Sequence, residues 1–325
     1  MRILNFGSLN LDYTYDVNHF VQVGETLAST RMETFCGGKG LNQSLAIAKS
    51  GQEVWHAGAI GENDGEMLIE TLLQSGVHIN LISKKRGSSG HAIIQKDKAG
   101  QNCILLYGGA NQEITKQDVD LVLKQFDKGD YLILQNEISE VGYIIEKAYE
   151  KGMQIVFNPS PINDQIKAYP LEYVDYLILN EIEAQQICEV KAQELEENPK
   201  RLENRDRILE KIGHIEGIKQ EEITQAISLL TAYLPKAKIV LTLGGAGSIY
   251  VGEEGILFQK AYGVEVVDTT AAGDTFTGFF IGNLAQGKGV GQAMELAAKA
   301  AAISVTRKGA GPSIPSQQEV LDFKH

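Results

Sequence analysis

The sequence is poor in cysteine, proline and tryptophan, with three, seven and one of these among its 325 residues. The cysteines have no paired spacing, and neither they nor the six histidines form a zinc pattern, so we expect reduced thiols and a cytoplasmic protein. The opening residues MRILNFGSLNLD contain no signal-peptide h-region or cleavage site, and no apolar run of about 18 residues occurs. Secretion and membrane insertion are therefore not expected.

The sequence also lacks an excess of basic residues. Its net charge is −12 with a pI near 5.1, and the lysines and arginines are scattered, so the basic face of a nucleic-acid-binding protein is absent. A small-molecule partner is the better expectation. Because 43% of the residues are hydrophobic, the chain can bury a large core, as one large α/β domain or two smaller ones.

Most of the chain alternates short β-rich runs with helical patterns. Residues 53–60 and 131–137 are strand-like, and the helical patterns that follow them end at Gly76 and Gly152, the usual residue type after a helix. This order predicts βαβ units and a mostly parallel sheet with helices on both faces. Residues 264–269 (VEVVDT) are also predicted to be a strand, leading into a helix that begins near Asp274.

Three segments depart from this alternation. Residues 11–36 and 90–108 read as strands with no helix between them, and the second segment reads as a hairpin about the turn DKAG. Such strands predict a small separate sheet, which we interpret as a lid over the carboxyl edge of the main sheet. Residues 191–222 are dense in charges of both signs and predict a solvated helical insertion or flexible loop, with a partner-docking element as the alternative.

Two turns of small residues carry the first chemical signal. GGAGS (244–248) follows an apolar strand pattern, and TAAGD (270–274) precedes a helical one. Small residues let backbone N–H groups approach a ligand, and a helix N-terminus favours anions, so the two turns suggest a nucleotide polyphosphate. The Walker pattern and a complete GxGxxG are both missing, and a glycine-rich turn taken alone is more often a simple structural turn.

Asp274 gives the second turn a chemical meaning. A lone aspartate at a helix N-terminus can be a cap. If the amides of Ala271, Ala272 and Gly273 bind a phosphoryl group, however, the carboxylate of Asp274 lies within reach of the attacking hydroxyl. It could then accept that hydroxyl's proton while the amides stabilise the developing charge.

The chain resembles the PfkB carbohydrate kinase family over almost its whole length. The resemblance rests on motifs in collinear order: GSLNLD, GGKGLNQSLAIA, QNE, NPSP, LNEIEA, TLGGAG, DTTAAGDTF and AAAISVTRKGAGPSIP. It implies a ribokinase-like fold, an α/β three-layer sandwich with a mostly parallel central sheet flanked by helices and a small β-sheet lid, in a single kinase domain over 1–325. The implied activity is ATP-dependent phosphorylation of a sugar, here the 5-hydroxyl of D-ribose.

The resemblance also assigns the site. Asp274 would be the catalytic base, with the amides of residues 271–273 as the anion hole. The sugar would be bound by Asn10, Asp12, Gly38, Lys39, Asn42 and Glu137. Taken singly, these residues have plainer explanations: an Asx-turn for Asn10 and Asp12, helix-start chemistry for GGKG, and a surface carboxylate for Glu137.

The nucleotide and its metal ions would lie in the C-terminal half. Asn180 and Glu183 match a motif that positions Mg²⁺, although a helix cap followed by an exposed charge gives the same pattern. The nucleotide would contact Thr242, Gly244, Gly245, Gly247 and Ser248. A monovalent cation, usually K⁺, would be held, largely through backbone carbonyls, at Asp268, Thr270, Ser304, Arg307, Gly309 and Ser313, where the alternative is a simple loop before the last helix.

Several alternatives remain open at this level. The acceptor could be deoxyribose, another pentose or a nucleoside, and the chain could instead be a sugar- or nucleotide-binding sensor without turnover. The resemblance implies a homodimer through the lid strands. Apolar positions there, such as Tyr13, Tyr15, Val17, Ile93 and Ile104, fit that dimer and equally fit burial against the chain's own sugar site.

Overall fold

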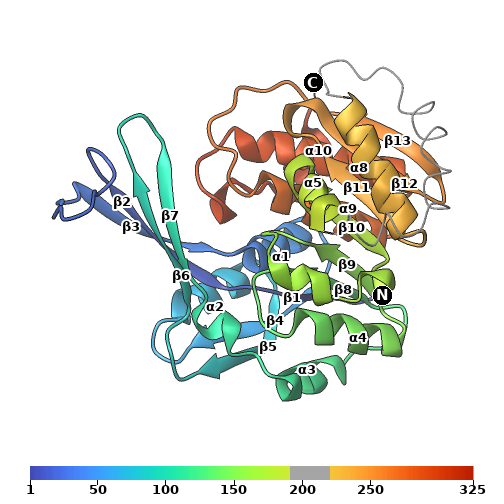
Figure 1. Cartoon of the computed structure of the whole chain (residues 1–325), viewed down its shortest axis with the longest axis horizontal. Coiled ribbons are helices and arrows are strands. Elements are labelled where there is room, and N and C mark those ends of the chain that lie inside the picture. Colours follow the sequence, from blue (N-terminus) through green and yellow to red (C-terminus); the bar gives the residue numbers. More distant parts are fainter. Residues whose placement is uncertain (191–219, 325) are drawn as a thin grey trace.

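A computed structural model describes residues 1–190 and 220–324 (Figure 1). The charged segment predicted at 191–222 therefore lies outside the described residues, except for its last three positions, which fall in helix α8. Two sheets organise the described chain, one of nine strands and one of four.

The large sheet is mostly parallel, as predicted. Its strands lie in the order β13-β12-β11-β10-β9-β8-β1-β4-β5, and only β12 and β13, at one edge, pair antiparallel. Its central strands are apolar on both faces, which is the pattern of a sheet covered on both sides. The bounds are β1 Ile3–Phe6, β4 Val54–Gly61, β5 His78–Lys85, β8 Tyr131–Gln135, β9 Gln154–Asn158, β10 Tyr176–Asn180, β11 Lys238–Thr242, β12 Gly247–Gly252 and β13 Gly255–Lys260.

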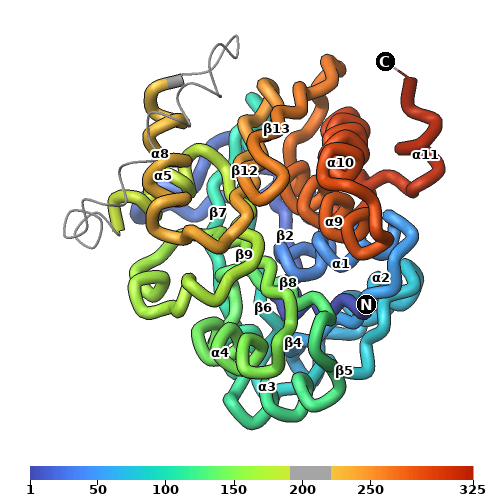
Figure 2. Tube along the Cα trace, turned by 90° about the vertical axis from the view of Figure 1, so that its right-hand side faces the viewer, coloured from blue at the N-terminus to red at the C-terminus, as the bar shows by residue number. Residues whose placement is uncertain are grey.

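Helices cover both faces of this sheet (Figure 2). One apolar cluster joins the sheet to α3, α4, α5 and α8, and a second joins the opposite face to α1, α2, α9, α10 and α11. The three-layer sandwich is thus confirmed. The bounds are α1 Lys39–Lys49, α2 Glu66–Gln74, α3 Lys116–Leu123, α4 Val141–Lys151, α5 Glu181–Val190, α8 Gln220–Tyr233, α9 Ala272–Ala285, α10 Val290–Val305 and α11 Gln317–Asp322.

The small sheet projects from one side of the sandwich (Figure 1). Its order is β3-β2-β6-β7, and β6 and β7 form the predicted antiparallel hairpin, closed by a turn in which Gly100 N donates to the carbonyl of Asp97 (3.0 Å). The separate small sheet is therefore confirmed. The bounds are β2 Asn10–Asp16, β3 Arg31–Gly37, β6 Gly90–Lys96 and β7 Asn102–Tyr107.

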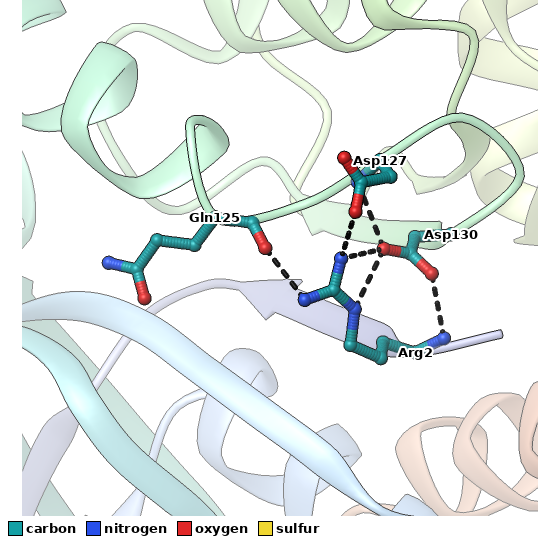
Figure 3. Close-up of polar contacts among 4 residues, drawn as sticks. All are labelled: Arg2, Gln125, Asp127 and Asp130. Atoms are coloured by element: carbon teal, nitrogen blue, oxygen red, sulfur yellow. Dashed lines mark hydrogen bonds and ion pairs between the residues drawn. The ribbon is translucent and has the colours of Figure 1, made fainter.

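The start of β1 is fixed by Arg2 (Figure 3). Its backbone N donates to Asp130 Oδ1 (2.9 Å) and its guanidinium donates to Asp130 Oδ2 (2.7 and 3.0 Å) and Asp127 Oδ2 (2.9 Å). It also donates to the carbonyl of Gln125 (2.7 Å). Because these acceptors lie in the turn before β8, the contacts set β1 in register beside β8, and this register aligns the ends of the strands that carry the site.

One predicted strand is wrong. Residues 264–269 form no strand; instead the backbone N–H groups of Val267 and Asp268 both donate to the carbonyl of Val305 (2.7 and 3.1 Å). The segment therefore closes the end of helix α10 and pairs with no sheet edge. A β-branched run predicts extended backbone, but the structure provides no neighbouring strand for it.

Across residues 1–190 and 220–324, no helix is both long and apolar enough to cross a bilayer.

Candidate active site

Asp274 lies in the first turn of α9, and its side chain is 7% exposed. Gln43 Nε2 donates to its Oδ1 (2.9 Å) and Asn42 Nδ2 donates to its Oδ2 (3.1 Å). Burial raises the pKa of this carboxyl, against the opposing effects of Lys39 and the two amides. The result is a carboxylate held by two neutral donors in a desolvated position, where it is more basic than an ordinary aspartate.

The turn before Asp274 has an unusual backbone. Ala271, the N-cap residue, has φ 59°, in the left-handed region that costs a residue with a Cβ about 1 kcal/mol or more. Ala272, the first residue of α9, donates its backbone N–H to the carbonyl of Thr269 (3.2 Å), and a Cβ added at Gly273 would meet no atom within 4 Å. Residues 271–273 line a cavity at a helix N-terminus, which suits an anion.

The N-terminus of α1 meets Glu137 at the carboxyl edge of the sheet. Gly38, the N-cap, has φ 93°, and a Cβ at Gly40 would lie 2.3 Å from Ser8 N, so only glycine fits at position 40. Glu137 Oε2 accepts from the backbone N of Lys39 (2.9 Å) and from the Ser8 hydroxyl. Glu137 is half-buried, so the surface-carboxylate interpretation is wrong.

Lys39 is the cation of this edge. Burial by itself lowers the pKa of its ammonium, but the carboxylates of Asp274, Glu137 and Glu183 outweigh burial and raise that pKa. Lys39 lines a cavity together with Asn158, Asn180, Glu183, Thr242 and residues 271–274. A permanent positive charge therefore lies in the same cavity as the proposed base and the helix N-terminus.

Strand β2 carries the next two predicted sugar residues. Asn10 is buried, and its Oδ1 accepts from Asn111 Nδ2 (2.8 Å). Asp12 lies within the strand, where a Cβ added at Gly37 would be 2.0 Å from its Oδ2, and burial and the nearby Glu137 raise its pKa to about 6. Neither residue forms an Asx-turn, so that simpler explanation does not hold.

Asn180 and Glu183 cap helix α5 reciprocally. Glu183 Oε2 accepts from Asn180 N (3.0 Å), and Asn180 Oδ1 accepts from Glu183 N (2.9 Å). The cap predicted as the plainer explanation is thus present, but Glu183 is buried (9% exposed) and both residues line the cavity. Within the described ranges no three His, Cys, Asp or Glu side chains are grouped to hold a metal ion. One carboxylate and one amide suit a Mg²⁺ ion that keeps waters and phosphate oxygens as its other ligands.

The predicted nucleotide turn follows β11. A Cβ at Gly244 or Gly245 would meet nothing within 4 Å, which leaves their backbone accessible to a ligand. Gly247 is required for another reason, because its φ is 129° and a Cβ there would lie 2.1 Å from the carbonyl O of Gln259. Ser248 is buried, and its hydroxyl makes no hydrogen bond within the described chain. Open glycine backbone of this kind fits a phosphate-bearing nucleotide.

Asp268 organises the predicted cation loop. Its Oδ1 accepts from Thr270 N (2.9 Å) and Thr270 Oγ1 (2.6 Å), and its Oδ2 accepts from Gly309 N (3.0 Å). The other predicted side chains are used within the loop: Ser304 and Ser313 donate to the carbonyls of Ala301 (2.8 Å) and Ala310 (2.7 Å), and Arg307 pairs with Glu319 (2.5 Å).

Sequence reasoning missed several residues that support the site. Ser8 hydrogen-bonds to Glu137 and Asn111 hydrogen-bonds to Asn10. Gln43 donates to Asp274 and also to Asn158. Gln43 and Asn158 lie inside the quoted motifs GGKGLNQ and NPSP, which was a usable signal. Asn111 lies outside every motif.

These groups define a phosphotransferase that acts on a sugar hydroxyl, and comparisons with known proteins identify its family. Residues 2–317 match the pfkB family carbohydrate kinase model, so the chain belongs to that family and the predicted resemblance is confirmed. The ribokinase of Haemophilus influenzae is 32% identical, over 98% of this chain and 96% of its own length. A deoxyribokinase of Salmonella typhi is 26% identical, over 99% of this chain and 98% of its own length.

Two solved structures show the same fold. The ribokinase of Cryptococcus neoformans in complex with ADP has a TM-score of 0.81 at 28% identity, covering 99% of both chains. The ribokinase of Arabidopsis thaliana complexed with ribose and ATP has a TM-score of 0.78 at 26% identity, again covering 99% of both chains.

Proposed function

We propose that this protein transfers the γ-phosphoryl group of ATP to the 5-hydroxyl of D-ribose, giving ribose 5-phosphate. The observation that carries the proposal is the buried carboxylate of Asp274, placed in the first turn of α9, where it lines a cavity together with residues 271–273. Relatives named ribokinase at about 30% identity and nearly full coverage support the choice of substrate.

The mechanism uses the chain's own groups in sequence. Asp274 accepts the proton of the attacking hydroxyl as its oxygen bonds to the γ-phosphorus and the bond from that phosphorus to the β,γ-bridging oxygen breaks, which releases ADP. The amides of residues 271–273 and the ammonium of Lys39 stabilise the negative charge on the phosphoryl oxygens in transfer. Asn10, Asp12 and Glu137 present amide and carboxylate groups to the sugar hydroxyls, and an acceptor lacking a hydroxyl leaves one of them unpaired. Closure of the small sheet over the edge would exclude water.

Two ions complete the proposal. Mg²⁺ would be held near Asn180 and Glu183, with water and phosphate oxygens as its other ligands, and would supply charge neutralisation at the phosphates. A K⁺ ion would be held by Asp268 and by backbone carbonyls of the loop that ends at Ser313. Because that loop lies behind the anion-hole turn, the ion would stiffen the turn without contacting substrate.

The proposed assembly is a homodimer through the small sheet, in the cytoplasm. Edge strand β7 exposes a continuous row of large side chains, including Ile104 (51% exposed), Leu105 (67%) and Leu106 (59%). An unpaired apolar edge of this kind is normally covered in solution. Sedimentation of the wild type and of a Leu105→Asp variant tests the dimer, which the charge should dissociate.

The first test is a coupled ADP-release assay with MgATP. Ribose, deoxyribose, arabinose, fructose and nucleosides are compared, each in K⁺ and in Na⁺ buffer free of ammonium. We expect the largest kcat/KM on ribose and higher activity in K⁺. The Salmonella relative makes deoxyribose the second candidate, and a preference for it would replace the substrate while keeping the mechanism. A sugar that shifts the melting temperature without any turnover would instead indicate a sensor.

A further inference from the structure

A chain of buried side-chain amides runs from Asp274 into the centre of the molecule. Gln43 Nε2 donates to Asp274 Oδ1 (2.9 Å) and to Asn158 Oδ1 (3.1 Å), so both of its hydrogens are used. Gln135 Nε2 donates to Gln43 Oε1 (2.7 Å) and to Asn5 Oδ1 (2.8 Å). All of these side chains are buried. They come from β1, α1, β8 and β9, four elements that meet under the site.

Backbone carbonyls bind the two ends of this amide network, Asn5 and Asn158, and so fix the orientation of every amide in it. Asn5 Nδ2 donates to the carbonyl of Gly40 (2.7 Å), and Asn158 Nδ2 donates to the carbonyl of Ile178 (2.9 Å). A backbone carbonyl can only accept, so both asparagines must turn their Oδ1 atoms toward the glutamines. Reversing Gln135 would place its oxygen against the oxygens of Asn5 and Gln43, and reversing Gln43 would place oxygen against Asp274.

We propose that Gln43 is a positioning residue for the proposed base, and that Gln135 and Asn5 hold its NH₂ group toward Asp274. This inference rests on the role of Asp274 in the proposed function. The chain fixes one carboxylate oxygen of Asp274 while Asn42 contacts the other, so the carboxylate keeps one plane and one orientation toward the cavity. The donor on Oδ1 favours the ionised form that accepts a proton.

The charged groups around Asp274 do not belong to this row of hydrogen-bonded amides. Lys39 on α1 lowers the pKa of Asp274 and Glu183 on α5 raises it, and the carboxyl of Asp274 raises the pKa of Glu137. Substitutions at Gln43 and Gln135 remove none of these charges. A change in the titration of Asp274 in those variants therefore reports the loss of the amide groups and not the loss of a charge.

The experiment compares pH profiles of kcat and kcat/KM for the wild type, Gln43→Leu and Gln135→Leu. In Gln43→Leu the acidic limb should move up by about one pH unit and kcat should fall about tenfold, with KM for sugar and ATP changed less than about twofold. Gln135→Leu, which does not contact Asp274, should move the limb in the same direction by a smaller amount.

Ser44→Ala is the matched control. Ser44 Oγ accepts from Asn5 Nδ2 (2.8 Å) and pairs with His56 (2.8 Å), so its loss disturbs the same buried region. Asn5 still donates to Gly40 in that variant, and the chain keeps its direction. We therefore expect a lower Tm with an unchanged acidic limb.

The outcomes separate this inference from the proposed function. An active wild type whose acidic limb is the same in Gln43→Leu and Gln135→Leu would overturn only the positioning role, as would an equal shift in Ser44→Ala. A wild type that phosphorylates no acceptor in the panel would overturn both. If Gln43→Leu does not fold, Gln43→Glu preserves the side-chain volume. Its carboxyl must then share a proton with Asp274, which should raise the acidic limb further.

Discussion

The two aspartates that flank the turn 268–274 have opposite electrostatic settings. Hydrogen bonds from Thr270 and the backbone N of Gly309 outweigh partial burial and lower the pKa of Asp268. Burial outweighs two side-chain amides and Lys39 and raises the pKa of Asp274. The same residue type is therefore a stabilised anion at one end of the turn and a more basic carboxylate at the other.

The opposite pKa shifts of Asp268 and Asp274 indicate which of the two can act as a base. Asp268 accepts from two backbone N–H groups that cannot leave without unfolding the loop, so its charge serves the structure of the turn and, in our proposal, a cation. Within the described residues Asp274 accepts from the side-chain amides of Asn42 and Gln43, and its raised pKa matches the transfer of a proton from a hydroxyl. In our proposal the turn couples the two, because the backbone between them forms the anion hole.

Asp274→Asn should have the largest effect. The amide cannot accept the hydroxyl proton, so kcat should fall by about 10²–10⁴-fold, while ribose binding by calorimetry stays within about threefold. The wild-type acidic limb should lie above 3.8, the ordinary pKa of an aspartate, because activity requires the ionised form of a group whose pKa is raised. Full activity in the variant would remove Asp274 as the base.

Gly273→Ala probes the amides between the two aspartates. An added Cβ meets no protein atom within 4 Å, so the fold should tolerate it and Tm should stay the same or rise slightly. The methyl group would occupy space that the phosphoryl group needs, and kcat/KM for ATP should fall about tenfold or more.

Gly245→Ala and Gly247→Ala are controls with contrasting surroundings. The space around position 245 is open, so Gly245→Ala should change KM for ATP and leave Tm unchanged. Position 247 is closed by the Gln259 carbonyl, so its effect should appear in Tm. Unchanged kinetics in Gly273→Ala would argue against the anion hole.

Asp268→Asn tests the other end of the turn. Removing the charge should weaken activation by K⁺ about tenfold, which corresponds to roughly 1.4 kcal/mol of lost attraction. Activity at saturating K⁺ should recover most of the wild-type value, because Asp274 is unchanged. The measurement is the initial rate against K⁺ concentration at constant ionic strength. An identical K⁺ dependence in wild type and variant would count against the cation site.

The sequence predicted the sheet, the separate small sheet and the family, because periodicity and collinear motifs are local signals. It failed at residues 264–269, where β-branched residues met a helix end instead of a strand. The support of Asp274 was not predictable in the same way. Asn5, Gln43 and Gln135 are distant in sequence and meet only because β1, α1 and β8 pack together. Likewise, the pattern at Asn180 and Glu183 left a helix cap and a place in the site as alternatives. In the structure the two residues form the cap and also line the cavity.

The smallest expected effect is on thermal stability, where Asp268→Asn and Asp274→Asn should change Tm in opposite directions. A lowered pKa stabilises the fold above the unfolded value near 3.8, and that contribution disappears as pH falls through the folded value. A raised pKa does the reverse, because ionisation above 3.8 costs the folded state more than the unfolded state. At pH 7, Asp268→Asn should therefore lower Tm by about 2 °C. The loss has a second cause, because the new NH₂ group must face an N–H donor of Thr270 or Gly309.

Asp274→Asn should leave Tm unchanged or raise it by about 2 °C at pH 7. The new NH₂ group can be accommodated, because Asn42 Oδ1 is buried without a hydrogen-bond partner in the described chain and a flip of that amide supplies an acceptor. The Asp274→Asn difference should shrink as pH falls through the raised pKa of Asp274 toward 3.8, whereas the Asp268→Asn difference should shrink only below 3.8, as pH falls through the lowered pKa of Asp268. Thermal melts from about pH 2 to pH 8 measure this, and losses of equal size in both variants at pH 7 would mean that burial does not set the two ends of the turn apart.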